Sequence, residues 1–232
     1  MAILRSRQAL VGSRTQLVNH VRGAVKSFGG RLPKCPACPA RSFHNRAPEH
    51  IPEALRPALG PVLEQIGLLT ELIRDYDRKL ETVSKERYPE TELLRQVEGV
   101  GPLTALSFVL TLEDPYRFEK SRSVGAYLGL VPARDQFGGK DPQKRISKEG
   151  DETLRKLLVG NSHYILGPFG SDSDLRRHGE KIASRGGKNA KKRAAVAVAR
   201  KLSVLLHHLW VTGEVYDPLH NTHRRQEREE AA

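Results

Sequence analysis

Apolar residues recur at helical spacing along most of the chain and predict a mainly α-helical protein. In the first 28 residues, Leu10, Leu17, Val21, Val25 and Phe28 recur at steps of three, four and seven, which places them on one stripe of a helix. The remaining positions of this segment are rich in Arg, Gln, Asn and Ser. We therefore expect a long basic helix whose stripe packs inside the protein and whose opposite face is open to a partner.

The most regular pattern covers residues 55–83. A strict alternation of four- and three-residue steps is the spacing of a coiled-coil seam. It predicts self-association or an antiparallel hairpin with another helix, with a single amphipathic helix packed on its own domain as the alternative. Gly60 and Pro61 weaken only the start of the pattern. The seam residues are Leu55, Leu59, Val62, Ile66, Leu69, Ile73, Tyr76, Leu80 and Val83.

From about residue 91 shorter helical patterns alternate with glycine-rich turns. No apolar run approaches the roughly 18 residues of a membrane span, which argues against an integral membrane protein. Residues 29–50 hold four prolines and predict an irregular connector. We expect a basic helix, connector and coiled-coil segment at 1–90, a compact helical domain at 91–220 and a flexible tail at 221–232. Its helices are expected at 91–97, 102–111, 121–129, 151–166, 172–184 and 189–211, with room for a short hairpin within 133–147.

Charge is distributed unevenly along the chain. The 232 residues hold 39 Lys and Arg against 27 Asp and Glu, a net charge of +12. Residues 1–46 contain nine basic residues and no acid, and residues 134–201 contain seventeen basic and eight acidic residues. Clustered cations gain affinity for a polyanion by releasing its counterions. DNA or RNA is therefore the expected partner, and a merely solvated basic surface is the alternative.

Residues 94–106 have the pattern of a helix-hairpin-helix. Gly99-Val100-Gly101 permits a tight turn, and Pro102 suits the first position of the following helix. Free N–H groups at that helix start, with Thr104 close by, would contact phosphate without reading base identity. A plain turn between packed helices is the alternative.

A second candidate site opens the last long helix. Four cations, Lys188, Lys191, Lys192 and Arg193, lie at a helix start, where the macrodipole disfavours positive charge unless an anion binds there. The spacing of a Walker A loop is absent, which excludes an ATPase of that class. Further nucleic-acid contacts are expected from Lys140, Arg145, Lys148 and Arg155.

Metal and redox chemistry have little support. Cys35 and Cys38 are the two cysteines, too few for a disulfide framework, which fits a cytoplasmic location. With His44 and His50 they suggest zinc only weakly, because both histidines fall in the proline-broken connector. The acidic groups, Glu113-Asp114, Asp135 with Asp141 and Asp172 with Asp174, form no set that would hold metal ions, and the last pair is expected to cap a helix.

Several motifs occur together and in order. They are LVNHVRG at 17–23, RLPKC, the heptad helix, VEGVGPLTAL, AYLGLVP, RISKEGDETLRKLLV, HYILGPFG and RGGKNAKKRAAVAVARKLSVLLHHLW. Over residues 3–219 the chain resembles bacterial transposases of the insertion-sequence 110/116/902 family. The resemblance implies a recombinase for transposition, with a RuvC-like domain that binds magnesium through an acidic tetrad, a coiled coil, and a carboxy-terminal domain with a nucleophilic serine. It also implies a structured guide RNA as a further partner.

Two departures from that family affect the expected activity. The chain begins where the RuvC-like domain should end, so we expect no cofactor here and a truncated, catalytically incomplete member. The family serine position reads Phe137, and a phenyl ring has no nucleophilic atom. Ser147 and Ser162 are nearby, but a substitute nucleophile would have to be positioned for attack. A dimeric regulatory or architectural DNA-binding protein is the alternative function, and a helix-hairpin-helix repair factor a weaker one.

Overall fold

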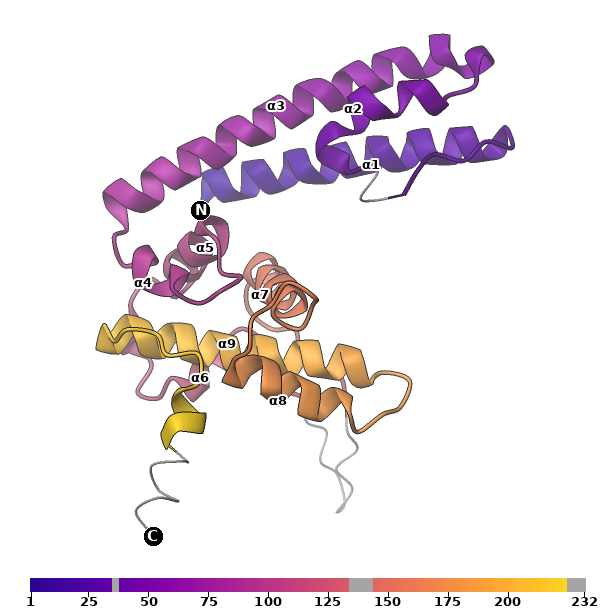
Figure 1. Ribbon diagram of the computed structural model, residues 1–232. Helices are drawn as coiled ribbons and strands as arrows, with labels where there is room; N and C mark the ends of the chain where they lie inside the picture. Colours follow the sequence, from indigo (N-terminus) through magenta and orange to yellow (C-terminus); the bar gives the residue numbers. More distant parts are fainter. Residues whose placement is uncertain (35–37, 134–143, 225–232) are drawn as a thin grey trace. The chain divides into compact units, whose positions relative to one another are not determined.

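The computed structural model describes residues 1–34, 38–133 and 144–224, and it is mainly α-helical (Figure 1). The chain divides into two compact units, Met1–Thr82 and Val83–Ala232. The boundary falls inside the helix α3, which spans Arg56–Arg87. Among the described residues there is no β-strand, and Pro132 and Ile146 form one isolated antiparallel bridge. The fold class predicted from the apolar periodicity is confirmed.

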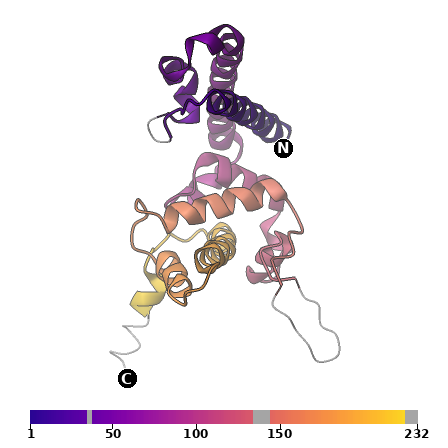
Figure 2. The ribbon, with the colours of Figure 1, turned by 90° about the vertical axis from the view of Figure 1, so that its right-hand side faces the viewer.

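The first unit is built on α1, Ala2–Ser27, and α3, which lie side by side (Figures 1 and 2). They run antiparallel, because Arg7 pairs with Asp77 and Arg14 donates to the Thr70 hydroxyl. The apolar seam of α3 therefore packs against another helix of the same chain. Of the two predicted arrangements, self-association and an antiparallel hairpin, the structure has the hairpin. The buried cluster contains Val18, Val21 and Val25 of α1 together with Leu55, Leu59, Leu63 and Ile66.

The segment between α1 and α3 is irregular over its described residues 29–34 and 38–39, as expected, and from residue 40 it packs into short helical turns. It forms α2, Phe43–Arg46, and three short 3-10 helices, Ala40–Ser42, Pro48–His50 and Glu53–Leu55. The Phe43 ring is fully buried and lies 5.2 Å from the guanidinium carbon of Arg22. Pro39, Pro48 and Pro52 lie at the starts of the three 3-10 helices, and Phe43, Ala47 and Ile51 between them pack into the buried cluster.

Three of the five cations of α1 stabilise the unit, so its basic face is less open than expected. Arg7 and Arg14 reach α3, and Arg22 donates to the carbonyl oxygens of Pro33 and Cys38 at 2.9 and 3.2 Å. Phe28 is 62% exposed and does not belong to the buried stripe, because α1 ends at Ser27 and Phe28 caps it.

The second unit packs its helices around the long helix α9, Ala190–Thr212. The preceding helices are α4, Thr91–Arg95; α5, Pro102–Leu112; α6, Arg122–Tyr127; α7, Glu152–Ile165; and α8, Asp174–Ala183, with a 3-10 turn at Pro115–Arg117. α8 lies alongside α9, whereas α7 runs across it (Figures 1 and 2). The expected helices are present, with ends shifted by up to two residues. Their shared core includes Phe108, Leu112, Leu154, Leu158, Val198, Leu202 and Leu206.

By length and composition, α9 is the one helix in the described part of the chain that could cross a membrane. Arg200 and Lys201 interrupt its apolar sequence, and for this reason the sequence pattern argued against a span. Half of its apolar window is buried inside the protein, as in the core helix of a soluble domain.

Candidate nucleic-acid interface

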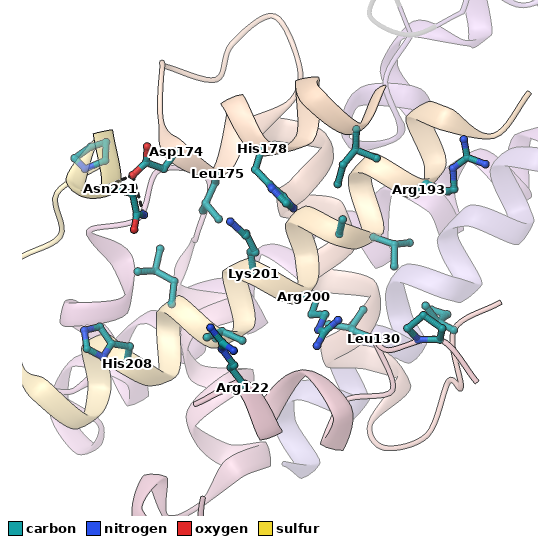
Figure 3. Close-up of a pocket in the computed structure, with 18 of the residues that line it drawn as sticks. Arg122, Leu130, Asp174, Leu175, His178, Arg193, Arg200, Lys201, His208 and Asn221 are labelled. Carbon is teal, nitrogen blue, oxygen red and sulfur yellow. Dashed lines mark hydrogen bonds between the residues drawn. The ribbon is translucent and has the colours of Figure 1, made fainter. Parts of the chain in front are cut away.

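A broad groove of about 1680 Å³ runs along α8 and α9 in the second unit (Figure 3). Its other walls come from α6, from residues 130–132 and 144–148, and from the chain after α9. Among the residues that the structure describes, three acidic residues line it, Asp174, Glu214 and Asp217. The groove therefore carries a strong positive excess. The nine basic lining residues are Arg122, Lys144, Arg145, Lys148, Arg185, Lys192, Arg193, Arg200 and Lys201.

Two glycines allow residues 144–148 to form a wall of the groove. Gly129 and Gly150 both have positive φ, and a Cβ at Gly129 would lie 2.3 Å from the backbone of Glu149. This close approach lets Ser147 N–H donate to the Val131 carbonyl and Lys148 N–H to the Gly129 carbonyl. The flanks of the expected 133–147 hairpin are thus paired, with a single bridge, and Arg145 and Lys148 reach the groove.

The outer face of α9 supplies another wall. Arg193 and Arg200 are seven residues apart, so both project from the same side of the helix, and Lys201 also lines the groove. The stem of Arg200 packs on α6, because a Cβ at Gly125 would lie 2.9 Å from Arg200 Cγ. Arg193 also donates to the Gly186 carbonyl at 3.1 Å, which closes the glycine turn before α9. Packing thus holds two of the cations at defined positions.

His178 of α8 and Lys201 of α9 both lie in the middle of the groove (Figure 3). Burial lowers the pKa of His178, and the neighbouring cations Lys201, Arg185 and Lys181 lower it further. His178 is therefore largely neutral at pH 7, and the positive charge of the groove comes from Lys and Arg.

The chain after α9 closes the end of the groove at the start of α8. The Asp174 carboxylate accepts a hydrogen bond from Asn221 N–H at 2.7 Å (Figure 3). It also accepts one from the Thr222 hydroxyl at 2.8 Å. Burial raises the pKa of Asp174, but these hydrogen bonds outweigh it, so the net pKa lies below its ordinary value. Asn221 and Thr222 were expected in a frayed tail, and the structure instead binds them to the start of α8.

The cations predicted from the sequence do not all meet in this groove. Lys192, Arg193, Arg145 and Lys148 line it, whereas Lys188 and Lys191 are exposed at the start of α9 outside the lining. The sequence reasoning missed Arg122, Lys144, Arg185, Arg200 and Lys201, although helical spacing from Arg193 indicates Arg200. The sequence pattern indicated only the cations at the start of α9, where positive charge conflicts with the helix dipole.

Arg155 has a structural position, which corrects the expectation that it contacts nucleic acid. It is buried, and its guanidinium donates to the carbonyl oxygens of Leu128 and Glu149 at 3.1 and 2.7 Å. Its spacing of three from Leu158, followed by Ser162 and Ile165, places it on the buried stripe of α7. The helical spacing in the sequence therefore indicates a buried position for Arg155.

The glycine turn at 99–101 is anchored to α7. Gly99 has a φ of 89°, as a tight turn requires. Thr104 is buried and its hydroxyl pairs with the Asn161 side chain, whose amide, with its nitrogen toward the turn, also donates to the Gly99 carbonyl at 3.2 Å. Thr104 is therefore shielded from a ligand, and Val100 is buried as well. Phosphate binding by Gly99 and Gly101 stays a prediction.

Several other candidates fall outside the described residues, namely Phe137, Lys140, Cys35, Asp135 and Asp141. Both alternative serines have buried hydroxyls: Ser162 donates to the Leu158 carbonyl, and Ser147 Oγ finds no partner in the part of the chain that is described. Burial raises the pKa of the Cys38 thiol. Within these residues no three His, Cys, Asp or Glu side chains gather as metal ligands would.

Comparison with known proteins identifies relatives along nearly the whole chain. Residues 91–164 match the model of the transposase IS116/IS110/IS902 family. The transposase for insertion sequence element IS1111A of Coxiella burnetii is 32% identical over 225 residues, which cover 93% of this chain and 59% of that protein. The transposase for insertion sequence element IS1328 of Yersinia enterocolitica is 32% identical over 68% of this chain and 47% of its own length. The chain thus spans about half to three fifths of these relatives.

Proposed function

We propose that this chain, which belongs to the IS116/IS110/IS902 transposase family, binds nucleic acid for the transposition of an insertion sequence. DNA is the proposed partner, because the related transposases are named for mobile elements. The groove along α8 and α9 carries the proposal. Its described lining holds nine cations against three acids on one concave surface, which would hold a phosphate backbone. Such contacts position a duplex and leave its base sequence unread.

The affinity of the chain for a short fluorescent DNA duplex, measured by anisotropy from about 50 to 200 mM salt, tests the proposal. We expect the affinity to fall steeply, by close to one unit of log-log slope per neutralised phosphate. Replacing Lys192 and Lys201 by Ala should lower that slope by about two units, because each substitution removes one contact with a phosphate. A duplex and an RNA hairpin measured side by side would show which polyanion is preferred.

A matched control comes from the start of α9. Lys188→Ala with Lys191→Ala removes the same charge outside the groove, so its effect should be much smaller. Equal losses in the two double variants would place binding elsewhere. Affinity that does not change with salt would contradict phosphate binding altogether.

The serine-dependent step of the family is proposed to be absent from this chain. The proposal rests on Phe137, which stands where the resemblance implies the nucleophile. Ser147 and Ser162 offer no evident replacement, since both hydroxyls are buried. This favours the second candidate function, a regulatory or architectural DNA-binding protein that retains the groove and lacks the covalent step.

Self-association through residues 55–83 belongs to the same proposal in a revised form. The seam itself is covered by α1, but Leu68 and Leu72 are 62% and 46% exposed one turn apart on α3. These two leucines are the exposed large apolar residues in the described part of α3, and they are proposed as the surface that a second copy covers.

A further inference from the structure

The turn between α7 and α8 exposes a phenylalanine. Phe169 lies in the sequence Gly167-Pro168-Phe169-Gly170 and its side chain is 78% exposed. A single exposed apolar residue needs no explanation by itself. Here, however, the surrounding contacts fix the turn that presents it.

Arg176 of α8 clamps this turn. Its Nη1 donates to the carbonyl oxygens of Ile165, Gly167 and Gly170 at 2.9, 2.7 and 3.0 Å, and its Nε pairs with Glu180 at 2.9 Å. A Cβ at Gly170 would lie 2.2 Å from the Ile165 carbonyl oxygen. The backbone is therefore held in one conformation, and Phe169 would lose little entropy on binding a partner.

A second aromatic residue lies next to this turn. Tyr164 is 41% exposed and packs against Gly99, where a Cβ would be 2.8 Å from its ring. Its hydroxyl donates to Glu98, which also accepts hydrogen bonds from Ser171, two residues after Phe169. Glu98 thus joins Tyr164 to Ser171, and the turn that carries Phe169 is held next to Tyr164.

The surface formed by Tyr164 and the turn that carries Phe169 adjoins the groove. A small cavity of about 80 Å³ is lined by Tyr164, Gly170 and Ser171. Leu175, Tyr216 and Pro218 line both this cavity and the groove. Phe169 directly precedes Gly170, so a strand that passes from the groove over Leu175, Tyr216 and Pro218 would reach its turn.

We propose that Phe169 stacks on an unpaired base of a nucleic-acid strand that leaves the groove. The inference rests on the proposed function and adds single-stranded nucleotides as a ligand class. Every base has a π face, so an aromatic side chain stacks without regard to sequence. The Glu98 carboxylate disfavours a phosphate at this surface, and hence the base meets the phenyl ring while the backbone stays with the cations of the groove.

The test compares a single-stranded oligodeoxynucleotide with a duplex of the same sequence. Phe169→Ala should weaken binding of the single strand about 5- to 100-fold, because one base–aromatic stack is lost, and should leave duplex affinity nearly unchanged. Phe169→Trp and Phe169→Tyr should bind as the unsubstituted chain does, whereas Phe169→Leu should behave as Phe169→Ala. Quenching of 2-aminopurine in the oligonucleotide reports stacking directly and should disappear in Phe169→Ala.

Tyr116 provides the control, since it is 74% exposed on the 3-10 turn Pro115–Arg117 and outside both cavities. Tyr116→Ala should change neither affinity. A Phe169→Leu variant that binds like the parent would replace stacking by a plain apolar contact and overturn the inference. Salt-dependent binding that is indifferent to Phe169 would remove this inference alone, whereas loss of salt dependence would remove the proposed function too.

Discussion

Asp174 joins two segments of the second unit through one side chain. Its carboxylate accepts hydrogen bonds from Asn221 and Thr222, and its own N–H donates to the Pro218 carbonyl at 2.8 Å. The sequence predicted Asp174 as a helix cap, but the cap of α8 is Ser173, whose hydroxyl accepts from Arg176 N–H. Both residue types cap helices well, and only the packing of the later segment makes Asp174 its anchor.

Asp174→Asn should destabilise the second unit by about 1–2 kcal/mol, because an amide cannot accept as many hydrogen bonds as a carboxylate. The folded-state pKa of Asp174 lies below its ordinary value of 3.8, so the stabilisation is present above that pH and is lost as pH falls through the folded pKa. Denaturant unfolding from pH 7 to pH 2 measures both effects. Asp172→Asn serves as the control, since its pair with Arg177 is exposed, and an equal loss there would contradict the anchor.

At the scale of elements, α3 has one buried apolar face and another face that exposes two leucines to solvent. Leu59, Ile66, Leu69 and Ile73 are buried, whereas Leu68 and Leu72 point outward. The heptad spacing predicted the buried face. It did not indicate which helix covers that face, because a seam is equally suited to a second copy and to α1.

Leu68→Glu with Leu72→Glu should convert a self-associating chain into a monomer in sedimentation experiments and leave its helical content unchanged, since both side chains are exposed. Arg74→Gln with Arg78→Gln shifts the net charge by the same two units at exposed positions of α3 away from the face of Leu68 and Leu72, and should not affect association. Ile66→Ala should instead cost about 2–5 kcal/mol of stability through the cavity it leaves. A parent chain that is monomeric at micromolar concentration would contradict the proposed interface.

The remaining elements show where sequence reasoning succeeds and fails. Periodicity located α1, α3 and α9, because a long amphipathic stripe has one geometric solution. Periodicity also places Arg155 on the buried stripe of α7 and Arg200 on the same side of α9 as Arg193, but it does not indicate that Arg155 binds backbone carbonyls or that Arg200 lines a groove. The groove itself arises from α6, α8 and α9 meeting in space, and no local pattern encodes that meeting.

At the scale of the whole molecule, the resemblance implies covalent chemistry at a position that Phe137 occupies. We expect no protein–DNA adduct when the chain is incubated with magnesium ions and end-labelled DNA and run on a denaturing gel, because a phenyl ring cannot attack phosphorus. Binding measured in the same samples confirms that the protein is active as a ligand. An adduct mapping to Ser147 or Ser162 would show that a buried hydroxyl becomes accessible and that the nucleophile is misplaced.

The antiparallel pairing of α1 with α3 also sets an order of events during synthesis. Arg14 and Arg7 cannot form their contacts until Thr70 and Asp77 have been synthesised. The apolar side of α1 therefore stays uncovered until much of α3 has left the ribosome. At about 5–20 residues per second this interval lasts several seconds. Closing the longer loop costs slightly more entropy, and the pair should zip from the Val25 end toward the amino terminus. Until then, nascent α1 is a segment for chaperones to shield.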